Sequence, residues 1–277
     1  MKELWIAIPD SVVCEQKGGR EKTEKLGGIA RACAIFGIKR IFVYRDPEGK
    51  YDEDRNLILL VLRYLETPQY LRKKLFPITK ELSYAGILPP LKIPSHKQKI
   101  SLRDIKDGEI REAVLEEVKG KLYADAGLDA LIPFKGKGHP GERVTVEIKG
   151  KYPNFYCIEI NKEEIGSYWG YEVKGVDVLE KLLTSTRADF TILTSRYGRT
   201  ISSIWKEFCR NVARSKRVLV VFGSPKRGLL EMLSKDWIKR HDFQLINMIP
   251  GQKVETVRTE EALIITLAII NLAKRIG

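Results

Sequence analysis

Two stretches that alternate between short apolar strands and amphipathic helices stand at the two ends of this sequence, and a segment of different character separates them. Residues 1–92 contain a strand–helix–strand unit and a further helix, and residues 170–277 contain several more strands and helices. Each stretch is too short to build a full parallel sheet with helices on both faces. We therefore expect one split α/β domain that is interrupted by an inserted domain, with both ends of the insertion close in space.

The first α/β stretch opens with a strand predicted at residues 4–8. Apolar residues then recur at helical spacing over residues 22–36, and Thr23 is expected to cap the start of that helix. A strand at residues 40–44 completes the strand–helix–strand unit with which a parallel sheet begins. A second helix is predicted at residues 56–66.

The inserted segment, residues 93–169, consists of short alternating runs that glycines separate. The expected strands are residues 109–114, 121–124, 128–133, 144–148 and 156–160. About five strands in this length suit a small β-barrel, and the OB-fold is the commonest barrel of this kind that binds nucleic acid. A β-barrel without a ligand is the alternative.

Basic residues lie in and just before this insertion. A loop at residues 135–143 carries several cations beside Tyr152, Phe155 and Tyr156, and a basic groove with stacking rings is how proteins hold single strands. The formal net charge of +13 also favours a polyanion such as nucleic acid or an acidic membrane surface, although excess lysine without such a partner is an alternative. The residues expected to contact RNA are Arg72, Lys73, Lys74, Lys135, Lys137 and Arg143.

Other classes of protein are disfavoured by the sequence. Residues 1–10 are too short and too acidic for a secretory signal, and the most apolar run, residues 262–273, is shorter than the roughly 20 residues that cross a bilayer. We expect a cytoplasmic protein without a membrane partner. The cysteines and histidines are scattered without the spacing of a metal site, so no metal is expected.

The second α/β stretch contains the expected helices 176–184, 204–215, 228–234 and 259–276 and the expected strands 190–193, 217–222 and 243–248. The last of these helices is apolar on nearly every side, so most of its faces must be covered. A single small domain supplies too little cover, and a partner subunit is the natural source of the rest. The sequence therefore predicts a homodimer.

Two loops in this stretch are typical of a ligand site. A buried strand ends in a glycine turn at residues 223–228, and another strand runs into a Pro-Gly loop at residues 250–251, a short extended piece and the last helix behind a Thr259 cap. Loops at the carboxyl edge of a parallel sheet are where α/β proteins bind ligands. The turn at residues 223–228 is not GxGxxG and the chain contains no GK[ST], so the dinucleotide-binding and P-loop interpretations lose their main support.

Three motifs in these loops resemble a known family. Val-Phe-Gly-Ser-Pro at 221–225, Asn-Met-Ile-Pro-Gly-Gln at 247–252 and Val-Arg-Thr-Glu-Glu-Ala at 257–262 resemble the carboxy-terminal trefoil-knot region of SPOUT (α/β-knot) methyltransferases. Stretches spread over nearly the whole chain resemble the archaeal and eukaryotic RNA methyltransferase branch with an OB-like insertion; they are residues 28–36, 62–71, 84–91 and 168–171.

This resemblance implies a split α/β trefoil-knot domain, residues 1–92 and 170–277, with an OB-like barrel at residues 93–169. It further implies S-adenosylmethionine held by the knot loops near a dimer interface. The implied cofactor-binding residues are Phe222, Gly223, Ser224, Asn247, Ile249, Pro250, Gly251, Val257, Thr259 and Ala262.

The resemblance also implies a catalytic role for Arg31, which would orient the substrate or stabilise a deprotonated base; an ordinary surface arginine is the alternative. Glu255 and Arg258 are further candidates for polar contacts at the same site. Residues 194–199 depart from the more acidic Ser-Glu-Arg-Gly-like loop of the family, so the resemblance assigns no role to Ser195 or Arg196.

The expected activity is S-adenosylmethionine-dependent methylation of a base in structured RNA, ribosomal RNA in the first place, with uridine N3 favoured by family analogy. A noncatalytic RNA-binding assembly factor with an unused cofactor pocket is the main alternative. An α/β enzyme that acts on an acidic small molecule is the third reading.

Overall fold

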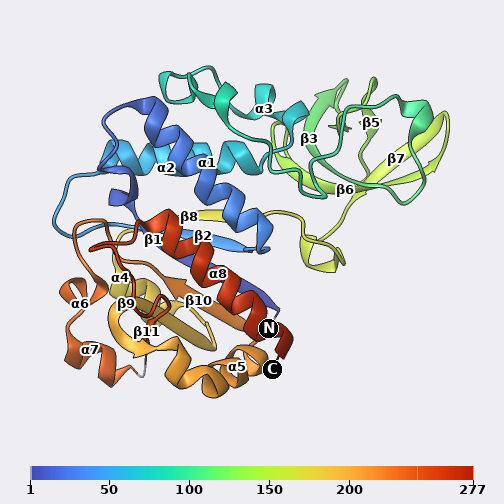
Figure 1. Ribbon diagram of the computed structural model, residues 1–277. Coiled ribbons are helices and arrows are strands. Elements are labelled where there is room, and N and C mark those ends of the chain that lie inside the picture. Colours follow the sequence, from blue (N-terminus) through green and yellow to red (C-terminus); the bar gives the residue numbers. More distant parts are fainter. Residues whose placement is uncertain (1, 242, 277) are drawn as a thin grey trace. The chain divides into compact units, whose positions relative to one another are not determined.

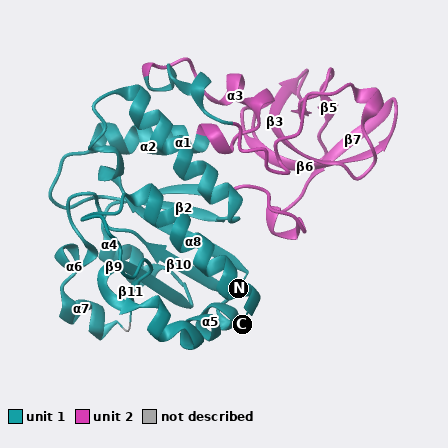
Figure 2. Ribbon diagram, viewed as in Figure 1, with its two compact units in different colours: residues 1–63, 81–89, 171–277 teal, residues 64–80, 90–170 magenta. Residues whose placement is uncertain are grey.

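The computed structural model describes residues 2–241 and 243–276, and the chain forms two compact units (Figures 1 and 2). Unit 1 contains residues 1–63, 81–89 and 171–277, and unit 2 contains residues 64–80 and 90–170. The β-rich insertion expected at residues 93–169 lies wholly within unit 2, which also contains residues 64–80, 90–92 and 170.

Unit 1 is built on a six-stranded sheet in the order β11-β9-β10-β1-β2-β8, and every neighbouring pair in it is parallel. The strands are β1 (Glu3–Pro9), β2 (Arg40–Tyr44), β8 (Glu172–Val176), β9 (Phe190–Thr200), β10 (Arg217–Val221) and β11 (Gln244–Asn247). The expected α/β class with a parallel sheet is thereby confirmed. Because all strands run the same way, the loops that follow them meet along one edge.

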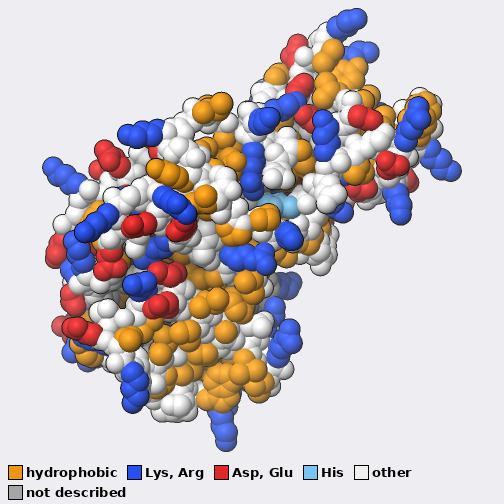
Figure 3. All heavy atoms as spheres, turned by 45° about the horizontal axis from the view of Figure 1, so that its top comes forward, with side chains coloured by type: hydrophobic (Ala, Val, Ile, Leu, Met, Phe, Trp, Pro, Cys, Tyr) orange, Lys and Arg blue, Asp and Glu red, His pale blue; other side chains and the backbone are white. Residues whose placement is uncertain are grey.

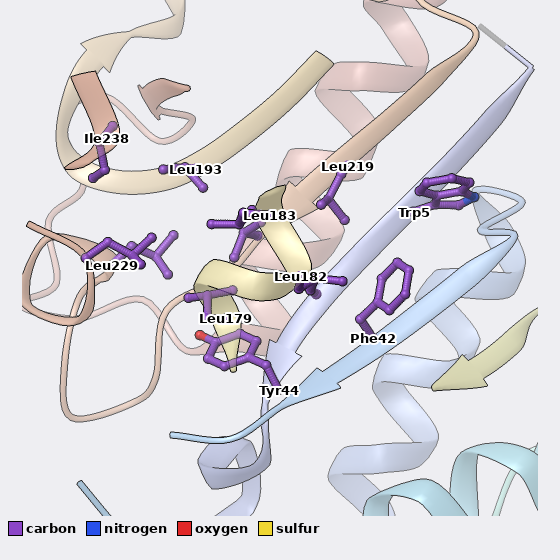
Figure 4. Close-up of a cluster of buried hydrophobic side chains, with 13 residues drawn as sticks. Trp5, Phe42, Tyr44, Leu179, Leu182, Leu183, Leu193, Leu219, Leu229 and Ile238 are labelled. Atoms are coloured by element: carbon purple, nitrogen blue, oxygen red, sulfur yellow. The ribbon is translucent and has the colours of Figure 1, made fainter. Parts of the chain in front are cut away.

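Helices cover the sheet of unit 1. They are α1 (Gly19–Ile35), α2 (Asp52–Glu66, whose last turn belongs to unit 2), α4 (Leu179–Ser185), α5 (Trp205–Arg214), α6 (Leu229–Met232), α7 (Lys235–Arg240) and α8 (Thr259–Ile276). Helices α1 and α5 both pack against α8. Leucines of α4 and α6 instead pack on Trp5, Phe42 and Tyr44 of the sheet, in the buried cluster that Figure 4 shows.

Several boundaries differ from the sequence prediction. Helix α1 begins at Gly19, so Thr23 is not its cap; the Thr23 hydroxyl donates to the Gly19 carbonyl at 2.7 Å inside the first turn. Strand β9 continues far beyond the expected 190–193, because its second half pairs with β11 after a register shift. The expected helix 228–234 corresponds to α6 alone; the Ser234 side chain accepts from the Trp237 amide and starts a second helix, α7, which was not predicted.

Strand β8 was missed by the sequence reading, which began a helix at residue 176. Its residues alternate poorly, and only Val173 is buried. The strand forms because it pairs in register with β2, from Glu172 opposite Arg40 to Val176 opposite Tyr44. The extended piece expected after the Pro-Gly loop contains no strand either; residues 253–255 form a bend, and residues 252 and 256–258 have no regular secondary structure.

Unit 2 contains helix α3 (Gln69–Leu75) and a five-stranded antiparallel sheet in the order β5-β4-β3-β6-β7. The strands are β3 (Ile110–Val118), β4 (Lys121–Asp125), β5 (Ile132–Pro133), β6 (Arg143–Lys151) and β7 (Asn154–Glu159). A parallel bridge between Phe134 and Cys157 brings the two outer strands together and nearly closes a barrel around an apolar core. Strands were predicted in all five places, although β5 is only two residues long.

Within the described residues, no helix combines the length and the apolar character that crossing a bilayer requires. Short 3-10 turns at Asp10–Val13, Lys80–Leu82, Ala85–Ile87, Leu102–Asp104, Lys162–Glu164 and Ile201–Ile204 complete the secondary structure.

Candidate active site

A cavity of about 250 Å³ opens at the carboxyl ends of β10 and β11 in unit 1. Three chain segments meet there: the glycine turn after β10, the loop after β11 with the start of α8, and the middle of β9. The lining residues are Thr194 to Tyr197, Phe222 to Gly228, Leu230, Glu231, Asn247 to Ile249, Gln252, Glu255 to Val257, Thr259, Ala262 and Thr266.

The structure brings the cofactor-binding residues expected from the resemblance to this one place. All of them line the cavity except Pro250 and Gly251. These two lie in an exposed turn, where Gly251 has a φ of +71° that favours glycine over other residues. The Phe222 side chain is itself buried, so it supports the wall from behind.

The glycine turn forms the first wall and closes tightly on itself. The Ser224 amide donates to the Arg227 carbonyl at 3.0 Å, and the Arg227 amide donates back to the Ser224 hydroxyl at 3.0 Å. A Cβ on Gly223 would stand 3.1 Å from the Arg227 carbonyl oxygen. Residue 223 therefore has to be small for this turn to form.

Contacts from the end of β2 and from the loop that follows it hold this turn in place, and they were not predicted from the sequence. The Arg227 guanidinium pairs with Asp46 and Glu48, and the Ser11 hydroxyl donates to Asp46 at 2.8 Å. The Tyr44 hydroxyl donates to the Phe222 carbonyl at 2.6 Å. Burial acts to raise the pKa of Asp46, but the hydrogen bonds to its carboxylate and the Arg227 charge outweigh burial and lower it.

Asn247 connects the second wall to the third. Its side-chain amide donates to the Arg196 carbonyl of β9 at 3.0 Å, and its side-chain oxygen accepts from the Ile249 amide at 3.0 Å. At the start of α8, which also lines the cavity, Glu260 lies 3.0 Å from the buried Lys25 ammonium of α1. Each wall is thus tied to a strand or helix outside the loop that forms it.

The wall contributed by β9 was not assigned in the sequence. The Arg196 guanidinium donates to the Glu255 carbonyl at 3.0 Å and to the Tyr197 hydroxyl at 2.6 Å. Glu255 lines the cavity as expected of a polar candidate, whereas Arg258 is not among the lining residues. A Cβ on Gly198 would stand 2.6 Å from backbone atoms of β11, so glycine permits the close approach of the two strands.

Arg31, the expected catalytic residue, lies on the exposed side of α1 and is not among the residues that line the cavity. The structure of one chain therefore does not bring it into the pocket with the other predicted site residues.

The cations expected to contact RNA fall into two groups in unit 2. Lys73 and Lys137 are exposed, and the Lys135 ammonium lies 3.5 Å from the centre of the Tyr156 ring. The others are engaged in the unit itself: Arg72 donates to the Leu65 and Thr67 carbonyls, and Lys74 pairs with Glu116 and Asp125.

Arg143 is the most heavily engaged of these cations. Its guanidinium pairs with Glu66 at 2.7 Å and with Glu112 at 2.6 Å. Both carboxylates are buried, and Glu112 also accepts from Thr145 and from the Trp169 ring. Burial acts to raise the pKa of Glu112, but the charges of Arg143 and Lys162 and these hydrogen bonds outweigh burial and lower it. Arg143 therefore has a structural role in unit 2.

The chain matches a known protein family over almost its whole length. Residues 3–270 match the family described as "Putative RNA methyltransferase". An uncharacterized protein of Halobacterium salinarum is 33% identical over 289 residues, which cover 97% of this chain and 99% of the relative. The 28S rRNA (uridine-N(3))-methyltransferase of Homo sapiens is 30% identical over 305 residues, with 96% and 77% coverage, and that of Drosophila melanogaster is 30% identical over 302 residues, with 96% and 61% coverage. This chain accordingly belongs to that family and is an RNA methyltransferase.

Proposed function

We propose that this enzyme methylates a base of ribosomal RNA with S-adenosylmethionine as methyl donor, and that the base is a uridine modified at N3. The observation that carries the proposal is the cavity in unit 1, in which three separate segments, each anchored from outside, converge at the carboxyl edge of the sheet. The names of the human and fly relatives support the choice of nucleotide.

The lining of the cavity fits an adenosyl group. Apolar side chains such as Leu230, Ile249 and Val257 offer surface for a flat base, and Ser224 and Asn247 offer polar atoms for a ribose. The tight turn at Gly223 leaves no room for a side chain, so the backbone itself forms that wall. The same lining also contains the charged residues Arg196, Lys226, Arg227, Glu231 and Glu255.

When bound, S-adenosylmethionine supplies an activated methyl group. The methyl is attached to a positively charged sulfur, and a nucleophile can displace that sulfur in line. The work of the chain is then to hold donor and acceptor in alignment and to exclude water, which contributes about 7–11 kcal/mol in favourable cases. Uridine N3 has to lose its proton, which passes to solvent, to become a nucleophile. In this proposal Arg31 stabilises the resulting anion, since arginine stays protonated.

We propose that unit 1 has the SPOUT trefoil knot. Strands β10 and β11 are consecutive in the chain, but β9 lies between them in the sheet. The chain therefore crosses β9 before it forms β11, and α8 then returns to pack against α1 and α5. A crossing followed by a return through neighbouring segments is what the knot requires, in contrast to the unknotted connections of most folds.

We propose that unit 2 is an OB-like barrel that contacts RNA. Its first strand pairs with its second and fourth, and the parallel bridge brings the third and fifth together, as in a five-stranded Greek-key barrel of this type. The RNA contacts would involve the exposed Lys73 and Lys137 and the pair Lys135 and Tyr156. Stacking of bases on such rings is worth about 1–3 kcal/mol per base.

We propose that α8 forms a homodimer interface. Ile264, Ile265, Leu272 and Ile276 of this helix are between 37% and 61% exposed. Figure 3 shows hydrophobic side chains gathered on the face of unit 1 that α8 occupies. Contiguous apolar surface of this kind is uncommon on monomers and is typical of subunit contacts.

Exchange of two of these residues for glutamate, in an Ile265→Glu/Leu272→Glu variant, is expected to convert the dimer to a folded monomer. The new carboxylates would lose their hydration in the interface but stay hydrated on a free subunit. Light scattering coupled to size-exclusion chromatography measures the mass. The matched control is Ile78→Glu in unit 2, where the residue is fully exposed and should leave the dimer intact. A wild-type monomer, or a variant that remains dimeric, contradicts the proposal.

Calorimetric titration with S-adenosylhomocysteine tests the cofactor. We expect saturable binding at one site per chain, and an absence of binding at millimolar ligand would leave an RNA-binding assembly factor as the better interpretation.

Mass spectrometric mapping of ribosomal RNA nucleosides from cells with and without the gene tests the substrate. The expected result is one 3-methyluridine that is absent without the gene.

A further inference from the structure

A second hollow, of about 430 Å³, lies in unit 1 between the last turn of α4 and the first residues of β1, β2 and β10. It therefore opens near the edge of the sheet opposite to the candidate active site. The lining residues are Trp5, Arg40, Phe42, Val176, Lys181, Leu182, Ser185, Thr186, Arg187 and Arg217. Four of these residues are cations, and no carboxylate belongs to the lining.

Two of the cations lie close to the same aromatic ring. The guanidinium carbon of Arg40 lies 4.9 Å from the centre of the Trp5 ring, and that of Arg217 lies 5.9 Å from it. Trp5 and Phe42 are buried and form part of the hydrophobic cluster that α4 covers, so this floor is rigid (Figure 4). Arg217 of β10 and Arg40 of β2 therefore approach this ring from the two strands that flank β1.

Of three carboxylates near the hollow, one forms an ion pair with a lining cation. Glu172 pairs with Arg40 at 2.8 Å but also with Lys174 at 2.9 Å. Glu3 accepts from the Trp5 ring nitrogen, and Asp189 accepts from the backbone amide of residue 217.

In the part of the chain that the structure describes, no carboxylate pairs with the side chains of Lys181, Arg187 or Arg217. Three other arginines of unit 1 are paired with carboxylates. Arg45 and Arg55 share Asp177, and Arg227 shares Asp46 and Glu48.

An arrangement of this kind attracts an anion. Like charges that a fold holds together repel one another, and a bound anion removes that repulsion. Guanidinium groups match the geometry of phosphate oxygens particularly well, and a ring beneath the guanidinium keeps it in position. The Thr186 side chain adds a hydroxyl to the same lining.

We propose that this hollow binds a backbone phosphate of the RNA substrate, at a distance from the base that is methylated. The inference depends on RNA being the substrate but not on which base is modified. Strand β10 leads from Arg217 at the hollow to Val221, the residue before the cavity wall at Phe222. Five residues of strand span roughly 16 Å, which a structured RNA easily covers. Phosphate contacts fix the position of an RNA without reading its sequence.

The test is a double charge reversal, Lys181→Glu/Arg187→Glu, in the full chain. Fluorescence anisotropy with a labelled stem–loop RNA over a series of KCl concentrations gives the affinity and its salt dependence. We expect binding to weaken about tenfold or more and the slope of log K against log salt to become shallower by about 0.7–0.9, which is roughly the contribution of one lost phosphate contact. Both residues are exposed, so the thermal midpoint and S-adenosylhomocysteine binding should stay unchanged.

The control is Lys235→Glu/Lys239→Glu on α7, which changes the net charge by the same amount at exposed positions outside the hollow. Equal weakening by both double variants would mean a general charge effect and would overturn the proposal. Unchanged RNA binding in the first variant would overturn it too, while leaving the enzyme assignment intact. A wild-type protein that binds no RNA at any salt concentration would instead contradict the RNA substrate itself.

Discussion

An Ala262→Phe variant is expected to lose S-adenosylhomocysteine binding by about 100-fold or more, which corresponds to roughly 2.8 kcal/mol. Ala262 lines the cavity from the first turn of α8, where its amide donates to the Arg258 carbonyl at 2.9 Å. A phenyl ring at this position would occupy much of a cavity of only about 250 Å³. Methyl transfer should fall in parallel, and calorimetry together with transfer of labelled methyl groups to RNA measures both.

The same variant should retain its RNA affinity, because the cavity is separate from the cations proposed to contact the phosphate backbone. Ala130→Phe is the matched control, since Ala130 is exposed in unit 2 and does not line the cavity. Unimpaired S-adenosylhomocysteine binding by Ala262→Phe would show that the ligand occupies another site. A parallel loss of RNA binding would point to misfolding, which the thermal midpoint detects.

An Arg143→Met variant is expected to destabilise unit 2 by about 3–5 kcal/mol. Removal of the guanidinium leaves Glu66 and Glu112 buried without their shared partner, and the two side chains are 8% and 0% exposed. Urea unfolding measures the free energy of unfolding, and hydrogen exchange should place the loss of stability in the strands of unit 2.

The stability of unit 2 should also depend on pH. Because the folded-state pKa of Glu112 is lowered, the stability that this group contributes is present above its unfolded pKa and is lost as the pH falls through the lowered value.

Two comparisons separate the buried network from ordinary surface charge. Adding Glu66→Gln and Glu112→Gln to Arg143→Met should restore a large part of the lost stability, since no buried charge then remains unpaired. Lys74→Met, which breaks more exposed pairs with Glu116 and Asp125, should cost at most about 1 kcal/mol. If Arg143→Met costs no more than Lys74→Met, the network has no structural role, and Arg143 becomes available for RNA binding again.

Local sequence patterns were sufficient for the parts of the fold in which one segment determines its own structure. Strands β1, β2 and β10 and helix α8 lie within two residues of their predicted bounds, because continuous apolar runs and helical spacing are local signals. The order of strands and helices also predicted the parallel sheet and the β-rich insertion. The residues of the glycine turn and of the loop after β11 came from motifs, and most of them line one cavity.

What could not be predicted depends on partners that are distant in the chain. Strand β8 exists through its pairing with β2, and the second half of β9 through its pairing with β11 at Gly198. In the sequence Arg143 looks like the other cations of a basic loop. Only the fold shows that two buried carboxylates surround it.

The candidate site shows the same difference between features set by local sequence and features set by contacts between distant residues. Local motifs identified the loops whose glycines and small side chains can receive a ligand through the backbone. That Arg227 is held by Asp46, 181 residues away, and that β9 supplies a wall of the cavity became visible only in the folded chain. Periodicity and turn chemistry act between neighbours along the chain, whereas ion pairs and cavity walls form between groups that only folding brings together.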